Sequence, residues 1–302
     1  MIIITIVSTN LCRIQDKMPV KKVQISVLIE DSKNPDKPDL RNKYGLSFFI
    51  QTKIGDNDVA VLMDTGPSPE TLLYNSAKMG INLEDIDVIV LSHGHYDHTG
   101  GLHEILKKIK KRIPVIGHPT VLQPKLSMMP HLRLIGAPVT SSNIESTHGV
   151  PVFATDPVTI ADGIMTTGEV PRISPFETVK GFWTVQNQRY IEDKMIDDQS
   201  LIIDVEGKGL VIITGCAHAG IINTIKYAQK IAKNRKVHAV LGGFHLISAS
   251  DNRIQATVDE LKKLNLEFVG PCHCTGKKAI KKMDEAFGDR CHYLHSGHIF
   301  EF

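Results

Sequence analysis

The chain has 302 residues, of which 42% are hydrophobic, with 35 Lys and Arg against 33 Asp and Glu. This composition is typical of a globular protein, and the length allows one large domain or two small ones with a sizeable core. A net charge of +2 with 6% aromatic residues gives neither a broad basic field nor a base-stacking surface, which argues against a nucleic-acid partner.

The start of the chain argues against membrane anchoring and secretion. No apolar run reaches the roughly 18–20 residues that span a bilayer. The opening MIIITIV lacks a basic leader and a clear cleavage site, so we expect a strand or an irregular start, and Met18 is an alternative start to Met1. The five cysteines are odd in number and do not suggest a disulfide framework, which favours a reducing cytoplasm.

Apolar, β-branched runs alternate along the chain with amphipathic segments. In chain order, the pattern predicts a strand at 59–63, a helix at 69–79, a strand at 87–91, a helix through 102–109, a hairpin of 200–205 with 209–214, a helix through 221–232, a strand at 237–241, a helix through 254–261 and a helix around 277–287. Ser250 or Asp251 is expected to cap the helix at 254–261.

The middle of the chain has a different pattern. Nine of the fifteen prolines lie between Pro114 and Pro175, where turn residues replace helix and strand patterns. We expect residues of about 118–195 to form an irregular insertion that shapes the substrate site. The two strand-rich halves, each covered by helices, then predict a four-layer αββα sandwich as a single α/β domain over 1–302, although periodicity alone allows other α/β folds.

The most informative segment is LSHGHYDHTGG at 91–101. It holds three imidazoles and a carboxylate that would be costly to bury without partners but are natural around a cation. His93 and His95 can share one face of an extended loop, while Asp97 and His98 can serve a second ion about 3.5–4 Å away. A position directly after a buried strand, where ligands bind in open α/β folds, disfavours a simple His-rich surface loop.

HGHYDH at 93–98 resembles the His-x-His-x-Asp-His signature of the metallo-β-lactamase superfamily, and VLMDTG at 61–66 resembles the early strand of that superfamily that ends in Asp-Thr-Gly. The resemblance covers most of the chain outside 118–195. It implies an αββα sandwich with two divalent metal ions between its sheets. Asp64 would steady the loop or act as a ligand; a plain turn residue before Gly66 is an equally good explanation.

Two later segments follow predicted strands and can supply the remaining ligands. The resemblance implies a His from GPCHCTG at 270–276, which is His273. In TGCAHAG at 214–220, Cys216 stands where an Asp commonly bridges the metals, and His218 follows two residues later. We favour His218 as the ligand, while Cys216 is either a thiolate ligand or a small buried side chain.

The middle His of the superfamily is absent, and Glu169 in TTGEVPR takes its place. The Glu169 carboxylate can bind a metal, face the substrate or pair with Arg172. His148 is another claimant for this place, although loop histidines are more often solvated.

Other histidines and cysteines have more than one explanation. Strand alternation predicts that Cys272 and Cys274 point away from the metals. His245 in GGFHL follows a strand and is a candidate for catalysis and for substrate or phosphate contact, or else a core histidine. The C-terminal histidines are expected to be structural: His292, His295 and His298.

TTGEVPR, TGCAHAG, GGFHL and PCHCTG together resemble one subgroup of the superfamily, the 7,8-dihydropterin-6-methyl-4-(β-D-ribofuranosyl)aminobenzene-5′-phosphate synthases. This implies a metal-dependent transferase of methanopterin-type cofactor biosynthesis, which joins a dihydropterin-methyl diphosphate to 4-(β-D-ribofuranosyl)aminobenzene 5′-phosphate and releases diphosphate. Arg172 with Lys180 or Arg189 is a candidate for the acceptor's phosphate, or a solvated loop charge. Trp183 with Phe182 is a candidate for covering the pterin ring, or a core anchor.

Two other functions stay open. In a hydrolase of a phosphoester or other ester or amide, a water activated by the metals attacks and Asp97 orients it. The third possibility is a non-catalytic metal-binding protein. Histidine ligands favour Zn²⁺, while a carboxylate such as Glu169 leaves room for Mn²⁺, Fe²⁺ or Mg²⁺. The sequence does not determine the oligomeric state.

Overall fold

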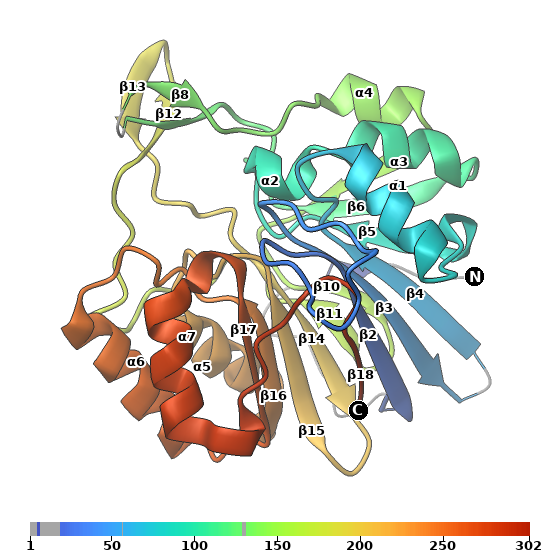
Figure 1. The fold of residues 1–302 in the computed structure, drawn as a ribbon. Helices are drawn as coiled ribbons and strands as arrows, with labels where there is room; N and C mark the ends of the chain where they lie inside the picture. Colours follow the sequence, from blue (N-terminus) through green and yellow to red (C-terminus); the bar gives the residue numbers. More distant parts are fainter. Residues whose placement is uncertain (1–4, 7–18, 56, 129–130) are drawn as a thin grey trace.

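Two seven-stranded sheets face each other in the computed structural model, which describes residues 5–6, 19–55, 57–128 and 131–302 (Figure 1). The first sheet has, in spatial order, β1 (Thr5–Ile6), β10 (Val158–Ala161), β11 (Ile164–Thr166), β14 (Ser200–Val205), β15 (Gly209–Thr214), β16 (Val237–Gly243) and β17 (Phe268–Cys272). The second has β18 (Ile299–Glu301), β2 (Lys22–Ile29), β3 (Ser47–Ile54), β4 (Asn57–Met63), β5 (Val88–Val90), β6 (Ile113–Gly117) and β9 (Gly149–Phe153).

Helices cover the outer faces of both sheets. The first sheet is covered by α5 (Ile221–Ile231), α6 (Asp251–Lys263) and α7 (Lys277–Phe287), and the second by α1 (Pro69–Lys78), α3 (Leu102–Ile109) and α4 (Ser141–Ser146) (Figure 1). Short helices complete the order: η2 (Leu83–Asp85), α2 (Tyr96–Thr99), η3 (His273–Thr275) and η4 (Gly288–Arg290). One hydrophobic core lies between the sheets and one under each helical layer. The predicted αββα sandwich is therefore confirmed.

The elements form where their sequence patterns predict them. On α3, the apolar stripe of Leu102, Ile105, Leu106 and Ile109 is buried, as an amphipathic helix requires. The hairpin of β14 and β15 pairs Ser200 with Thr214. The hydroxyl oxygen of Ser250 accepts a hydrogen bond from the backbone N–H of Arg253 and caps α6, which decides between the two predicted caps.

The segment 118–195 contributes to three sheets. β9 belongs to the second large sheet, and β10 and β11 to the first. The segment also contains α4 and forms a separate four-stranded sheet of β13 (Arg189–Glu192), β12 (Phe182–Gln186), β7 (Lys125–Ser127) and β8 (Arg133–Leu134). A single domain with an irregular insertion stays a prediction.

At the start of the chain, β1 pairs with β10, while Met18 and Cys12 lie outside the described residues. None of the helices in the described ranges has the length and apolar character needed to cross a bilayer.

The topology places several loops at one end of the sandwich. The strands β4, β5 and β6 are parallel to one another, as are β15, β16 and β17, so within each set the carboxyl ends meet at one edge. The four-stranded sheet stands over this end (Figure 1), and an isolated bridge between His95 and Gly136 connects the two.

Candidate metal centre

The loops after β5, β15 and β17 bring the six principal predicted ligands together in two groups. Within each group, the candidate ligand atoms lie within 4.8 Å of one another. The first group is His93, His95 and His218, and the second is Asp97, His98 and His273. All six side chains are buried.

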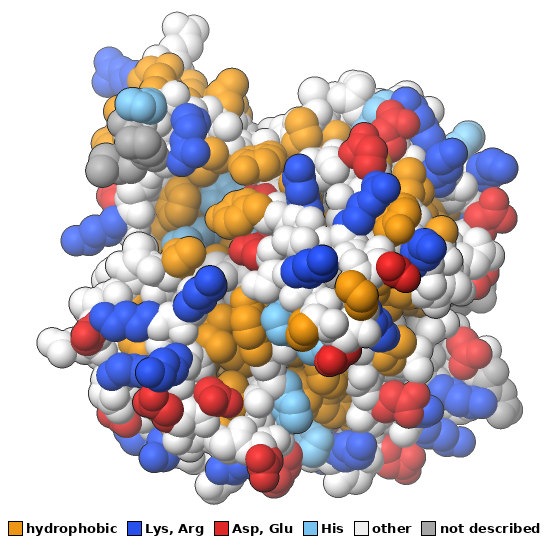
Figure 2. Space-filling view, viewed as in Figure 1, with side chains coloured by type: hydrophobic (Ala, Val, Ile, Leu, Met, Phe, Trp, Pro, Cys, Tyr) orange, Lys and Arg blue, Asp and Glu red, His pale blue; other side chains and the backbone are white. Residues whose placement is uncertain are grey.

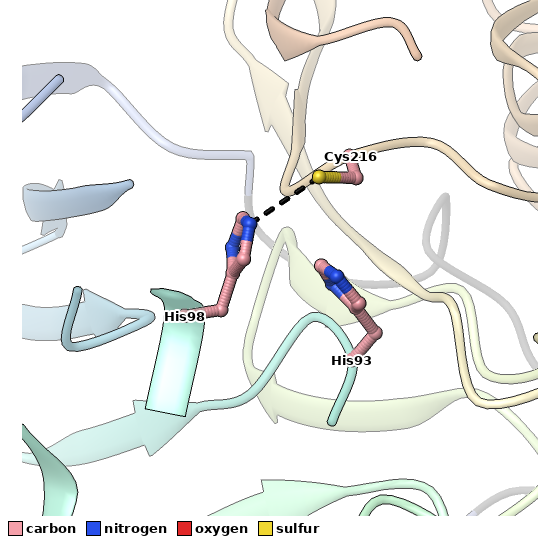
Figure 3. Close-up of side chains that lie close together, drawn as sticks. All are labelled: His93, His98 and Cys216. Carbon is pink, nitrogen blue, oxygen red and sulfur yellow. Dashed lines mark hydrogen bonds between the residues drawn. The ribbon is translucent and has the colours of Figure 1, made fainter. Parts of the chain in front are cut away.

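Cys216 lies between the two groups. Its Sγ is 3.3 Å from His98 Nε2, and it also forms close sets with His93 and with His218. Figure 3 shows the thiol and the ring of His98 pointing toward each other, with the ring of His93 beside them. Both alternatives from TGCAHAG therefore reach the centre, and each stays a candidate ligand.

The donor set fits divalent cations. Burial lowers the pKa of His93 and His218, and that of His95 to about 3, so these rings stay neutral and keep an unshared pair. His93 Nε2 and His95 Nδ1 lie 3.0 Å apart. His95 Nε2 and both ring nitrogens of His218 are buried without a hydrogen-bond partner in the described structure. Converging neutral imidazoles of this kind are typical of a metal site.

Among the candidate ligands, three histidine rings are each held by a hydrogen bond at Nδ1. His98 Nδ1 lies 2.7 Å from Asp64 Oδ2, and His273 Nδ1 lies 2.8 Å from Asp31 Oδ1. His93 Nδ1 lies 2.9 Å from the Ser92 hydroxyl. These contacts leave Nε2 of each ring to face the centre, which is how partners of metal-binding histidines act.

Asp64 supports the loop through further contacts. Its carboxylate accepts hydrogen bonds from the backbone N–H of Ser92 at 2.7 Å and from the Ser92 hydroxyl at 2.6 Å. It belongs to neither group of candidate ligands. Of the roles expected for Asp64, the geometry fits support of the loop best.

Asp97 is the carboxylate of the second group. Its Oδ2 lies 3.4 Å from His273 Nε2 and 3.7 Å from His98 Nε2. Burial alone would raise the pKa of Asp97, but the two neighbouring rings lower it. The carboxylate is therefore ionised and available to a cation or to a water.

The segment 197–199 joins the two main ligand loops, and sequence reasoning missed it. Asp197 Oδ2 accepts from the backbone N–H of Gly94 at 2.8 Å, between His93 and His95. Asp198 Oδ2 accepts from the N–H of Ala219 at 3.0 Å, next to His218. Asp197 therefore fixes the loop that holds His93 and His95, and Asp198 fixes the loop that holds His218.

The buried side chain of Lys125 balances the negative charge of Asp197 and of the neighbouring Asp193. Lys125 Nζ donates to Asp193 Oδ2 and to Asp197 Oδ1, both at 2.9 Å. A Cβ at Gly94 would lie 1.9 Å from the carbonyl oxygen of Val121 and 2.9 Å from Lys125 Cε, so the ligand loop packs directly on this cluster and only glycine fits.

A cavity of about 370 Å³ opens at the centre. Its lining includes Tyr44, Phe182 and His245 together with His95, Asp97 and His218. The Phe182 ring centroid lies 5.1 Å from those of His95 and His218. Figure 2 shows histidine side chains at the bottom of a hollow with a hydrophobic rim. Trp183, the next residue on β12, does not line this cavity.

The predicted Glu169 and Arg172 lie outside the two groups. Glu169 is about half exposed at 47%, and its Oε2 lies 3.6 Å from Nε2 of the buried His118. Arg172 donates to the carbonyl oxygens of His218 at 3.1 Å, of Met195 at 2.9 Å and of Lys194. Its guanidinium therefore supports the loop backbone, and its role toward substrate stays a prediction.

The other candidates are placed as follows. His148 and Arg189 are exposed, and Lys180 lines a neighbouring cavity. Cys272 packs in the core between the sheets, as predicted. The C-terminal histidines contact aromatic rings or one another: His292, His295 and His298.

The prediction that Cys274 points away from the centre is wrong. Cys274 lines the cavity, and its thiol donates to the carbonyl oxygen of Cys216 at 3.5 Å. The reason is that β17 ends at Cys272 and a helical turn, η3, follows, so the alternation of a strand no longer applies.

Known proteins match this chain in sequence and in fold. The model of the metallo-β-lactamase superfamily matches residues 41–191. The chain belongs to this superfamily.

Two individual relatives and one solved structure are similar to most of this chain. The chain is 37% identical over 94% of its length to the 7,8-dihydropterin-6-methyl-4-(β-D-ribofuranosyl)-aminobenzene-5′-phosphate synthase of Methanocaldococcus jannaschii, of which it covers 98%. An uncharacterized protein of the same organism is 32% identical over 80% of the chain and 88% of that protein. A crystal structure of a metal-dependent hydrolase of the β-lactamase superfamily has a TM-score of 0.76 at 29% identity, covering 92% of this chain and 98% of the other.

Proposed function

We propose that this enzyme joins a dihydropterin-methyl diphosphate to 4-(β-D-ribofuranosyl)aminobenzene 5′-phosphate and releases diphosphate. The observation that carries the proposal is the match of almost the full chain, at 37% identity, to a synthase of that name. The two groups of candidate ligands beside an open cavity support it. The partners are therefore phosphorylated small molecules.

The candidate ligands divide between two cations. His93, His95 and His218 would hold one, Asp97, His98 and His273 the other, and Cys216 lies between them. Five imidazoles favour Zn²⁺. Two bound divalent cations would neutralise the charge that diphosphate gains on leaving.

The reaction forms a C–N bond and breaks a C–O bond and an N–H bond. The amine nitrogen of the acceptor bonds to the methyl carbon of the pterin, the bond from that carbon to the diphosphate oxygen breaks with its electron pair on the oxygen, and the nitrogen loses a proton. His245 lines the cavity, its ring is 4.1 Å from that of His218, and its Nδ1 has no partner in the described structure. His245 is our candidate for accepting this proton.

The remaining residues of the cavity position the substrates. Phe182 offers an aromatic face beside the centre, which suits a flat pterin ring. Since Phe182 rather than Trp183 lines the cavity, we assign this contact to Phe182. Holding both reactants at one wall of a small cavity supplies the orientation on which a bimolecular transfer depends.

The test is whether diphosphate release requires the acceptor. Purified protein with bound metal, measured by elemental analysis, is given the pterin diphosphate with and without the aminobenzene riboside phosphate. We expect coupled product and diphosphate in equal amounts. Equal rates of diphosphate release without acceptor would instead support a hydrolase, the description given to the structural neighbour. Tight metal binding without turnover would support a non-catalytic protein.

A further inference from the structure

A second cavity lies directly beside the centre. Its volume is about 570 Å³, and His245 lines both cavities. The two hollows therefore adjoin at one side chain, and their sizes fall in the range of small-molecule sites, roughly 300–1,000 Å³.

The second cavity is basic. Lys180 and Arg253 line it together with the hydroxyl groups of Thr178, Ser248 and Ser250, and no Asp or Glu of the described residues is part of its lining. Two positively charged side chains together with several hydroxyl donors are typical of the groups that recognise a phosphate.

Arg253 is fixed in place with donors to spare. Its Nη1 donates to the carbonyl oxygen of Thr178 at 2.8 Å, while its Nε is buried without a partner in the described structure. The nearby Glu177 uses its two carboxylate oxygens on the backbone N–H groups of Ile222 and Asn223, at 2.9 and 2.8 Å. Burial lowers the pKa of Arg253. An unpaired buried donor is costly, so Arg253 has hydrogen-bonding capacity that the described protein groups do not use.

The length of the acceptor molecule requires its phosphate to bind at some distance from the metal centre. Its reacting amine and its 5′-phosphate lie at opposite ends of the molecule, across the benzene ring and the ribose. If the amine reaches the carbon that loses diphosphate at the centre, the phosphate must lie away from the centre. The second cavity adjoins the centre through His245 and meets this condition.

We infer that the second cavity binds the sugar-phosphate end of the acceptor, with Arg253 and Lys180 contacting the 5′-phosphate. This inference rests on the proposed function for the identity of the ligand. Arg172, which the sequence suggested as a contact for the phosphate of the acceptor, donates instead to three backbone carbonyl oxygens.

The first experiment compares Arg253→Met with the parent enzyme, because Met keeps the apolar stem. We expect the KM for the acceptor to rise about 10- to 100-fold with kcat changed by less than about threefold, the size of effect of a lost charged hydrogen bond. An acceptor without its 5′-phosphate should react equally poorly with both proteins. Arg290→Met is the matched control, because Arg290 also donates to a carbonyl oxygen, that of Leu266 at 3.0 Å, and it should leave KM unchanged.

A second variant guards against loss of structure in the first. Lys180 is exposed on a loop, so Lys180→Met should fold normally and raise the KM for the acceptor several-fold. An unchanged KM in both variants, with product still formed, overturns the inference.

The second experiment separates this inference from the proposed function. Binding of ribose 5-phosphate is measured by calorimetry, without turnover, and we expect Arg253→Met to weaken it about tenfold or more. If no coupled product forms with the parent enzyme while this Arg253-dependent binding persists, the proposed function fails and the phosphate cavity stands. Equal binding by the parent and the variant counts against the cavity.

Discussion

At the scale of single residues, the candidate metal ligands depend on carboxylates that do not themselves belong to the ligand groups. Asp64 and Asp31 each hold the Nδ1 of a histidine, His98 and His273 respectively. Each contact fixes the orientation of the ring and makes its other nitrogen the one that faces the centre. We therefore expect the affinity for metal to depend partly on residues that contact the candidate ligands rather than the metal.

Asp64→Asn tests this dependence. Asp64 has a φ of 60°, a conformation that Asn tolerates, so the backbone should stay in place. Its amide cannot accept all the hydrogen bonds of the carboxylate, and we expect metal affinity to fall about 10- to 100-fold, measured by competition with a chelator. The exposed Asp289→Asn should have no effect, and an unchanged affinity in Asp64→Asn would contradict the assigned role.

Cys291 gives a prediction that depends on pH. Partial burial raises the pKa of its thiol to about 12, against about 8.5 for an unfolded chain. The folded protein thus keeps a proton that the unfolded chain loses, and this group lowers stability as pH rises above about 8.5. At pH 9, iodoacetamide should modify Cys291 at least about 100-fold more slowly in folded than in urea-unfolded protein, because the thiolate is the nucleophile. Mass spectrometry of the peptide measures both rates, and similar rates would refute the prediction.

Residues of the centre differ in how far the sequence could predict them. His93, His95, Asp97 and His98 are adjacent in the chain, so their spacing alone indicates a site. Asp31 meets His273 across 242 positions, and an isolated Asp in a loop carries no signal for such a contact. His218 could be proposed because it follows a strand, but its place beside His93 and His95 depends on how the two sheets face each other.

At the scale of elements, the segment 193–199 and the strand β7 support the ligand loops. Lys125 begins β7 and lies between Asp193 and Asp197, with side-chain exposures of 2%, 8% and 0%. Although burial alone would lower it, the two carboxylates raise the pKa of Lys125. A buried ion cluster of this kind is strongly destabilised when one member is removed, because the others stay charged and unpaired.

Lys125→Met is expected to lower the free energy of unfolding by about 3–5 kcal/mol, measured by urea denaturation. Lys107→Met is the matched control, because Lys107 forms an exposed ion pair with Glu104, each side chain 48% exposed. Such pairs contribute about 1 kcal/mol or less. Equal effects of the two substitutions would show that the buried cluster does not support the structure as described.

The periodicity of apolar residues predicts the helices and strands, but it does not predict the turns that connect them. The face of α3 and the hairpin of β14 and β15 are visible as local patterns. The turn η3, which brings Cys274 to the cavity, begins at His273 directly after β17 ends at Cys272, while Gly270 and Pro271 lie inside the strand rather than at the junction. The bridging role of Asp197 and Asp198 required knowledge of which loops lie side by side, and pairing over long sequence distances is not encoded in local preferences.

At the scale of the whole molecule, the two groups of ligands connect the two halves of the sandwich. His93, His95 and His98 follow a strand of the second sheet, while His218 and His273 follow strands of the first. Cations bound there would link the halves, so metal binding should contribute to stability. The order of strands within the sheets and the separate four-stranded sheet could not be read from periodicity, because both are non-local.

Removal of metal should therefore lower the melting temperature. Metal at 100 times its Kd adds about 2.7 kcal/mol to the stability of the folded state. We expect dialysis against a chelator to lower Tm and readdition of Zn²⁺ to restore it, measured by calorimetry. Asp64→Asn should show a smaller response to metal than the parent, and an identical Tm with and without metal would refute the link between the halves.

The position of His273 has a consequence for biosynthesis. His98 and His273 meet across 175 positions, so the nascent polypeptide emerges from the ribosome with three histidines of the HGHYDH motif long before their partner is translated. During that interval the second group of candidate ligands lacks His273 and is incomplete. The full set of candidate ligands therefore exists only after His273 has been translated, so we expect metal to bind late, when the two halves of the sandwich come together.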